Sequence, residues 1–294
     1  MSALHTVPCA VVSPITRRVI HVSVIRDSTQ HRQHRIPASH YIRPALVPRK
    51  QLKLPITSFS YLISKMSSWT PLESNPEVMS KVLWNFGVSE KWNVVDVLSL
   101  DSEMLGLIPR PAVALILLFP TSEKYEKLKE EEEAKLKESG QKISKDVYFL
   151  KQYIHNACGT IALIHSIANN LDTISLKDGM LKTFLDSTKD SSPEDRGAEL
   201  QKNADVAETH NNIAMEGQTG VPGDEEKIIH HFVAFVHKDG DLYELDGRKA
   251  FPINHGPTTP EKLVEDAAKV MTDIMKKDPD EVRFTACALT MVSD

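Results

Sequence analysis

Eight consecutive apolar residues, Ala112–Phe119, restrict the fold of this chain more than any other feature. Pro109 and Pro120 bracket the run, which is far shorter than the roughly 18 to 20 apolar residues that a membrane-spanning helix needs. An unbroken apolar stretch that prolines bound is typical of a strand whose two faces are both buried. We therefore expect residues 112–119 to form a strand in the middle of a sheet.

The charge of the chain divides it into two parts. Residues 1–66 contain ten Lys or Arg and one Asp, a net charge of +9, whereas residues 67–294 carry −14. The first part is rich in Pro and lacks sustained periodicity, which predicts a disordered basic extension before a folded domain, 67–294. It fits a transit peptide, an interaction arm or upstream sequence translated from an early start. We favour the last, because a helix signal follows Met66 almost at once.

The chain as a whole has a net charge of −5, so it lacks the basic excess expected of a nucleic-acid-binding protein. Its three cysteines, Cys9, Cys158 and Cys287, are odd in number and widely spaced. This pattern argues against a disulfide framework and for a reducing compartment. No apolar segment resembles a secretory signal or a membrane anchor. We expect a cytoplasmic protein that does not bind membranes.

Capping residues and apolar spacing predict the remaining elements. They are a short helix that opens at Asn75-Pro76-Glu77 and stops at Gly87, a solvated helix over 123–142 to which we assign no chemistry, a buried helix over 157–169 with Asn156 as N-cap, a long loose loop over 207–227, a helix from Thr259-Pro260 to Ile274, and a strand over 282–292.

A hairpin places two candidate catalytic side chains together. Asp239-Gly240 lies between two apolar runs, which is a strong signal for a two-residue turn. Paired residue numbers then sum to 479, so Asp246 lies opposite Val233 and diagonal to His231 on one face of the sheet. A carboxylate against one ring nitrogen fixes the imidazole tautomer and leaves the other nitrogen for a nucleophile.

Cys158 is the candidate nucleophile. It lies at the start of the buried helix, where unpaired backbone amides and the helix dipole lower the pKa of a thiol. Taken alone, a free Cys is most often a small buried hydrophobic residue. Gln152 precedes Cys158 by six residues and has an amide that can donate to an oxyanion. Adjacent strand positions face opposite ways, so His230 and His231 do not predict zinc, and we expect neither a metal nor a cofactor.

These residues stand in blocks that resemble the signature of the ubiquitin C-terminal hydrolases, and especially the small single-domain members. The blocks are Gln152–Thr160, His231-Phe232 and Leu242–Arg248, together with Asn75-Pro76-Glu77, Val95-Asp96-Val97, Pro252–Gly256 and Arg283-Phe284. The resemblance runs from about Trp69 to the end of the chain. Tyr153 and His155 depart from it, because residues at these positions are commonly smaller.

The resemblance implies a papain-like α/β (α+β) fold, with a central antiparallel sheet between helices and a knotted backbone. It implies Cys158 as nucleophile, His231 as general base and acid, Asp246 as the orienting carboxylate and Gln152 as the oxyanion donor. The 207–227 segment then corresponds to a loop that crosses over the active site. Such a loop admits only thin leaving groups, so the implied substrates are small adducts or peptides on the C-terminal glycine of ubiquitin.

The implied partner is ubiquitin or a close ubiquitin-like protein, bound by a monomeric enzyme. The tail of ubiquitin is basic, and an acidic domain steers a basic partner by its field. The resemblance further places Glu73, Glu77 and Asp96 on the ubiquitin-binding face, with Pro71 and Leu72 nearby.

Two other functions stay open at this point. A Cys-His-Asp acyltransferase passes the acyl group to an amine instead of water and forms an amine-dependent product. A ubiquitin-binding protein with little turnover sequesters ubiquitin without cleaving anything. We favour the hydrolase, because all four catalytic residue types are present.

Overall fold

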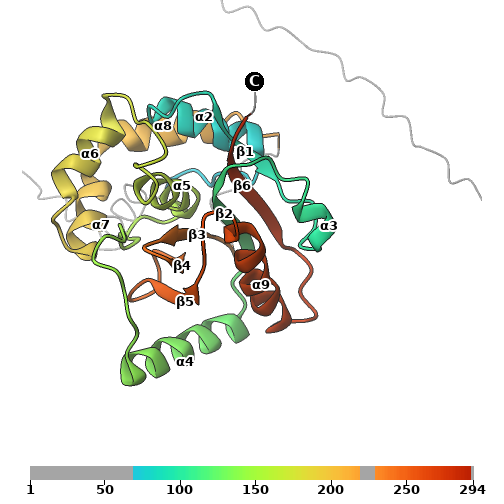
Figure 1. Ribbon diagram of the computed structural model, residues 1–294. Coiled ribbons are helices and arrows are strands. Elements are labelled where there is room, and N and C mark those ends of the chain that lie inside the picture. The colour runs from blue at the N-terminus through green and yellow to red at the C-terminus, as the bar shows by residue number, and fades with distance from the viewer. Residues whose placement is uncertain (1–68, 219–228, 293–294) are drawn as a thin grey trace, which may run out of the picture. The chain divides into compact units, whose positions relative to one another are not determined.

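The apolar run forms strand β2, Ala112–Pro120, which lies inside a six-stranded antiparallel sheet of order β1-β6-β2-β3-β4-β5. The computed structural model of the chain describes residues 69–218 and 229–292 (Figure 1). The predicted extension, 1–66, therefore lies outside the described residues. The other strands are β1 (Trp92–Asp96), β3 (His230–Lys238), β4 (Asp241–Leu245), β5 (Ile253–Pro257) and β6 (Thr285–Met291).

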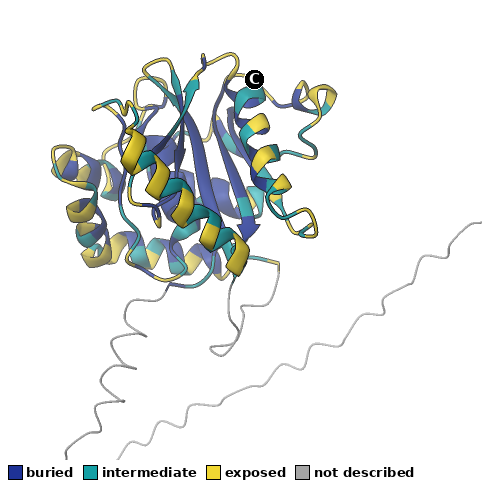
Figure 2. Cartoon of the chain, turned by 90° about the horizontal axis from the view of Figure 1, so that it is seen from below, coloured by how far each residue is buried: buried dark blue, intermediate teal, exposed yellow. Residues whose placement is uncertain are grey.

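Helices pack against both faces of this sheet (Figures 1 and 2). They are α2 (Pro76–Asn85), α3 (Ser102–Leu105), α4 (Glu123–Ser139), α5 (Cys158–Ala168), α6 (Met180–Thr188), α7 (Pro193–Lys202), α8 (Ala204–Ala214) and α9 (Leu263–Lys276). None of these helices has the length and apolarity required to cross a membrane. The mixed α/β fold with a central antiparallel sheet is confirmed.

Strand β2 supplies side chains to two hydrophobic cores. Ala114 and Ile116 belong to the core that α5 and α2 cover, whereas Leu115, Leu117 and Phe119 belong to the core beneath α9. Side chains alternate between the two faces of a strand, so a strand that is buried on both faces must be apolar throughout. The prediction of a central strand is confirmed.

The turn at Asp239-Gly240 has the predicted length and register. Ala234 pairs with Leu245 and Lys238 pairs with Asp241, so each pair of numbers sums to 479 as predicted. Both turn residues have positive φ, 49° and 85°, which is the conformation of a type I′ turn. This turn fixes which residues of β3 and β4 share a face, and with it the position of Asp246 relative to His231.

The predicted loop over 207–227 is wrong in its first part, because α8 extends to Ala214. Val206, His210 and Ile213 are buried at helical spacing, but a His in the middle hides the apolar pattern. His210 lies inside because both ring nitrogens have partners, Thr160 Oγ1 at 2.7 Å and the carbonyl oxygen of Thr70 at 2.6 Å. Residues 219–228 of the predicted loop lie outside the described residues.

Three predicted boundaries shift by a few residues. Helix α9 begins at Leu263 instead of Thr259, and α4 ends at Ser139 before Gly140, whose φ is 73°. Strand β6 begins at Thr285 instead of residue 282. The reason is local: the carboxylate of Glu281 accepts hydrogen bonds from the backbone N–H groups of the next two residues, which bends the chain before the strand.

Candidate active site

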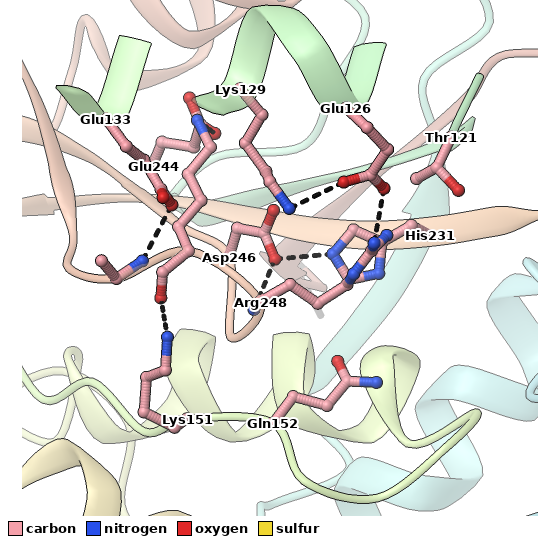
Figure 3. Close-up of polar contacts among 12 residues, drawn as sticks. Thr121, Glu126, Lys129, Glu133, Lys151, Gln152, His231, Glu244, Asp246 and Arg248 are labelled. Atoms are coloured by element: carbon pink, nitrogen blue, oxygen red, sulfur yellow. Dashed lines mark hydrogen bonds and ion pairs between the residues drawn. The ribbon is translucent and has the colours of Figure 1, made fainter. Parts of the chain in front are cut away.

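A pocket of about 550 Å³ brings together three of the four predicted catalytic residues. Gln152, Cys158 and His231 line it, and so do Glu123, Glu126 and Arg248. The fourth residue, Asp246, lies beside His231, and its carboxylate contacts the imidazole ring (Figure 3). Residues from α5, β3, the turn after β4 and the segment before α5 therefore meet at one place.

His231 and Asp246 form the predicted pair. Nε2 of His231 lies 2.6 Å from Oδ1 of Asp246, and the two residues are only 3% and 1% exposed. Asp246 comes one residue after the end of β4, where the hairpin register places it diagonal to His231. Since Nε2 faces the carboxylate, Nδ1 is the ring nitrogen left for Cys158. The predicted orienting role of Asp246 fits this geometry.

Cys158 is the first residue of α5, but the predicted N-cap at Asn156 is wrong. Asn156 adopts a positive φ of 63°, and its side-chain amide donates to the carbonyl oxygen of Trp69 at 3.0 Å. Ala157 occupies the N-cap position and provides no side-chain cap. The first backbone N–H groups of α5 are therefore not used by a side-chain cap, which leaves them to act on a thiolate or an oxyanion.

The electrostatics of the site favour a thiolate beside an imidazolium. Burial alone raises the pKa of Cys158, but the hydrogen bond and charge of His231 and the backbone N–H groups of Phe232 and Gly159 lower it overall. Burial alone lowers the pKa of His231, but the charge and hydrogen bond of Asp246, followed by those of Cys158, raise it to about 9. A nucleophile and its base are thereby charged before substrate arrives.

These shifts predict a bell-shaped pH dependence. Activity should fall at low pH as the Cys158 thiolate is protonated, with a midpoint below the ordinary thiol value of about 8.5, because the pKa of Cys158 is lowered. Activity should fall again at high pH as the imidazolium loses its proton, with a midpoint near pH 9 because the pKa of His231 is raised to about 9. Measurement of kcat/KM from initial rates over about pH 5 to 10 tests this. A descending midpoint near the unperturbed His value of about 6.5 contradicts it.

Gln152, the predicted oxyanion donor, lines the same pocket as Cys158. Its Nε2 donates to the carbonyl oxygen of Ile154 at 3.0 Å, and a side-chain amide has a second hydrogen to donate. Its backbone N–H donates to the carbonyl oxygen of Gly247 at 2.8 Å, which joins Gln152 to the turn that carries Asp246. A Cβ at Gly247 would lie 3.1 Å from the Gln152 Cβ, so this close contact favours glycine. The donor and the carboxylate are thus positioned by one turn.

The five candidate ubiquitin-binding residues do not line the pocket around Cys158. Glu77 and Asp96 are exposed, on α2 and at the end of β1, and Pro71 is half-buried. Glu73 accepts a hydrogen bond from the backbone N–H of Gln218 at 2.8 Å, so it holds the chain that follows α8. These four stay predictions.

Leu72 does not fit a contact with a partner. It is 6% exposed and belongs to the core. A Cβ at Gly159 would lie 3.0 Å from Leu72 Cδ2, so Leu72 packs directly beneath the residue that follows the nucleophile. The sequence does not show whether a large apolar side chain in the loop before α2 is buried in the core or exposed to a partner.

Arg248, Glu123 and Glu126 line the pocket without having been predicted there. The hairpin register does place Arg248 opposite His231, which is a signal that points to it. The two glutamates belong to α4, for which we expected no role, and no periodic pattern distinguishes them from the other acids of that helix. Within residues 69–218 and 229–292, no group of three or more His, Cys, Asp or Glu is placed to hold a metal ion.

Comparisons with known proteins show the family to which the chain is similar. Residues 69–276 match the family described as "Ubiquitin carboxyl-terminal hydrolase, family 1". A ubiquitin carboxyl-terminal hydrolase of Drosophila melanogaster is 52% identical over 225 residues, which are 76% of this chain and 98% of the relative. The human ubiquitin carboxyl-terminal hydrolase isozyme L1 is 47% identical over 220 residues, 74% of this chain and 96% of that protein.

A solved structure is also similar. The catalytic domain of Trichinella spiralis UCH37, bound to ubiquitin vinyl methyl ester, superposes with a TM-score of 0.61 at 27% identity. The match covers 78% of this chain and all of that domain, 100%.

Proposed function

Because the chain belongs to family 1 of the ubiquitin carboxyl-terminal hydrolases, we propose that it cleaves small adducts or peptides from the C-terminal glycine of ubiquitin. It is a cysteine-type hydrolase. The observation that carries the proposal is the 2.6 Å contact between His231 Nε2 and Asp246 Oδ1 in a pocket that also holds Cys158. Ubiquitin is the partner that the similar solved structure contains, as its vinyl methyl ester.

The reaction follows from the arrangement of these groups. The Cys158 thiolate attacks the carbonyl carbon of the last glycine, and the Cys158 N–H and Gln152 Nε2 donate to the oxyanion that forms. His231 gives its proton to the departing amine or thiol, and the C–N or C–S bond breaks to leave a thioester. Neutral His231 then takes a proton from water, whose oxygen attacks the thioester. Free ubiquitin and the Cys158 thiolate result.

The size of the pocket supports a preference for small leaving groups. Its volume of about 550 Å³ suits a small adduct or an unfolded peptide, whereas a folded protein is far larger. The net charge of −14 over residues 67–294 supports attraction of the basic tail of ubiquitin. The preference between ubiquitin and ubiquitin-like proteins, the monomeric state and the cytoplasmic location stay predictions.

A ubiquitin that carries a C-terminal vinyl methyl ester tests the proposal directly. We expect the Cys158 sulfur to add to the vinyl group and form a stable thioether, so that the mass of the protein rises by one ubiquitin. Peptide mass spectrometry should locate the adduct on Cys158. The Cys158→Ala variant is the control and should form none. Ubiquitin that binds without reacting at Cys158 supports a binding protein instead and contradicts the proposal.

A further inference from the structure

Helix α4 is attached to the domain mainly by charged side chains. None of its residues is buried, and exposed residues cover its outer side in Figure 2. Tyr125 is its main apolar contact, with the ring centroid 4.7 Å from that of Phe119. A helix without a buried apolar face depends on polar contacts for its position, because hydrophobic burial does not supply it. The sequence predicts α4 only as a solvated helix and does not reveal the polar contacts that fix its position.

Three glutamates of α4 contact residues 248, 249 and 250, a stretch that begins two positions after Asp246. Figure 3 shows Glu126 and Glu133 pointing from α4 toward this stretch. The contacts are Glu126 Oε1 with Arg248 Nη2, Glu132 Oε2 with Lys249 Nζ at 2.7 Å, and Glu133 Oε1 with the backbone N–H of Ala250 at 2.9 Å. The partners are 117 to 122 residues apart in the sequence.

Of the three contacts, the one between Glu132 and Lys249 involves the most deeply buried side chain. Lys249 is only 2% exposed, and its Nζ also lies 2.6 Å from Glu244 Oε1. A buried cation without partners is very costly, so the ammonium group keeps its carboxylates close. Lys151 Nζ donates to the Lys249 carbonyl oxygen, which fixes the backbone from the opposite side.

The same stretch determines where the catalytic carboxylate points. Oδ1 of Asp246 accepts from the backbone N–H of Arg248 at 2.8 Å, and the Lys249 N–H donates to the Asp246 carbonyl oxygen at 2.9 Å. The other carboxylate oxygen, Oδ2, is buried and has no hydrogen-bond partner in the described residues. Since only Oδ1 is held, a shift of the residues after Asp246 moves the carboxylate relative to His231.

We propose that α4 is a positioning element of the active site, in which Glu126, Glu132 and Glu133 hold residues 248–250 and thereby keep Asp246 against His231. The inference rests on the proposed function and deepens it, since it assigns these glutamates a part in the same reaction. They act through Asp246 and touch no reacting atom.

The proposal also predicts the direction in which the pH dependence changes. Many charged or titratable groups surround the pair of His231 and Asp246. They are Cys158 and His165 on α5, Lys151 before it, Glu244 on β4, Arg248 and Lys249 after it, His255 on β5, and Tyr125, Glu126, Lys129, Glu132 and Glu133 on α4. Removing acids from this set, or loosening Asp246, destabilises the imidazolium. Both changes lower the pKa of His231 and move the descending limb of activity to lower pH.

The test compares two variants of α4 in the full chain. The first, Glu126→Gln with Glu132→Gln and Glu133→Ala, removes the charge of two ion pairs and the acceptor of the Ala250 N–H. The second, Glu130→Gln with Glu131→Gln and Glu138→Ala, makes the same changes at three exposed positions of the same helix. Steady-state hydrolysis of a ubiquitin C-terminal fluorogenic amide is measured against pH.

For the first variant we expect kcat to fall about tenfold, KM to stay within about twofold, and the descending limb to move down by about one pH unit. The control should match wild type in all three. Added salt should lower the kcat of wild type but not that of the first variant, because salt screens the contacts that the variant lacks.

Circular dichroism and thermal melting check that both variants fold. If the triple variant does not fold, Glu133→Ala alone serves, because it removes the acceptor of the Ala250 backbone N–H and should still move the pH limb in the same direction. The inference is overturned if the first variant keeps the rate and pH profile of wild type. It is also overturned if the control variant changes to the same extent as the first. Absence of turnover in wild type contradicts the proposed function instead, so the two failures are distinct.

Discussion

Replacing Cys158 with Ala should lower kcat/KM for a ubiquitin C-terminal fluorogenic amide by about 10⁴-fold or more, since loss of a nucleophile removes the covalent route entirely. No second thiol substitutes for it among the described residues. Cys287, the other described cysteine, is 1% exposed on β6, outside the pocket, and burial raises its pKa to about 12. Binding of ubiquitin should persist, because Ala fits the space of the thiol.

Cys287→Ala is the matched control for this variant. It removes a thiol of the same kind from a position away from the reaction, so kcat/KM should stay within about twofold of wild type at a temperature where the variant is folded. Titration calorimetry with ubiquitin measures binding by Cys158→Ala. Residual turnover above about one hundredth of the wild-type rate, after contaminating wild-type protein is excluded, contradicts the nucleophile assignment.

Asp246→Asn should lower kcat by about 10⁴-fold, the size of loss seen when the orienting carboxylate of a triad is replaced by an amide. Burial alone raises the pKa of Asp246, but the charge and hydrogen bond of His231 lower it, so the carboxylate is ionised in the active enzyme. An amide of the same shape leaves no charge to stabilise the imidazolium. Its NH₂ group must also face either His231 or the buried Oδ2 position, which has no partner.

The pH profile separates this role from a structural one. With the carboxylate gone, the pKa of His231 falls from about 9, so the descending limb of activity should move to lower pH in Asp246→Asn. KM should change little. Asp172→Asn, at an exposed position, is the control and should retain the wild-type profile. A variant that loses activity with an unshifted pH profile indicates that Asp246 is needed for folding alone.

The hairpin and the central strand were predictable because their signals are local. Asp239-Gly240 sets a two-residue turn, and the pairing of every later residue follows by counting, which brings Asp246 to His231. Cys158 at the start of an apolar helix was predictable for the same reason. The His-Asp pair required only two strands that are adjacent in the sequence.

Predictions failed where a side chain served an uncommon purpose. Asn156 has the residue type of an N-cap, but its amide binds the Trp69 carbonyl instead. His210 looks polar, yet two hydrogen bonds allow it to be buried in α8, where a loop was expected. In each case a partner distant in the sequence decided the outcome, and the residue type alone does not reveal that partner.

The sequence by itself determined the sheet centre and the hairpin register, and it predicted Cys158, His231, Asp246 and Gln152 as the catalytic set. Only the tertiary structure decided how that set is held. The contact of Gln152 with Gly247 joins residues 95 positions apart, and the glutamates of α4 reach residues 248–250 across more than 110 positions. The reason is physical: turn type and apolar period act over a few residues, whereas ion pairs between distant segments carry no periodic signal. Seven glutamates lie on α4, and only packing selects the ones that bind.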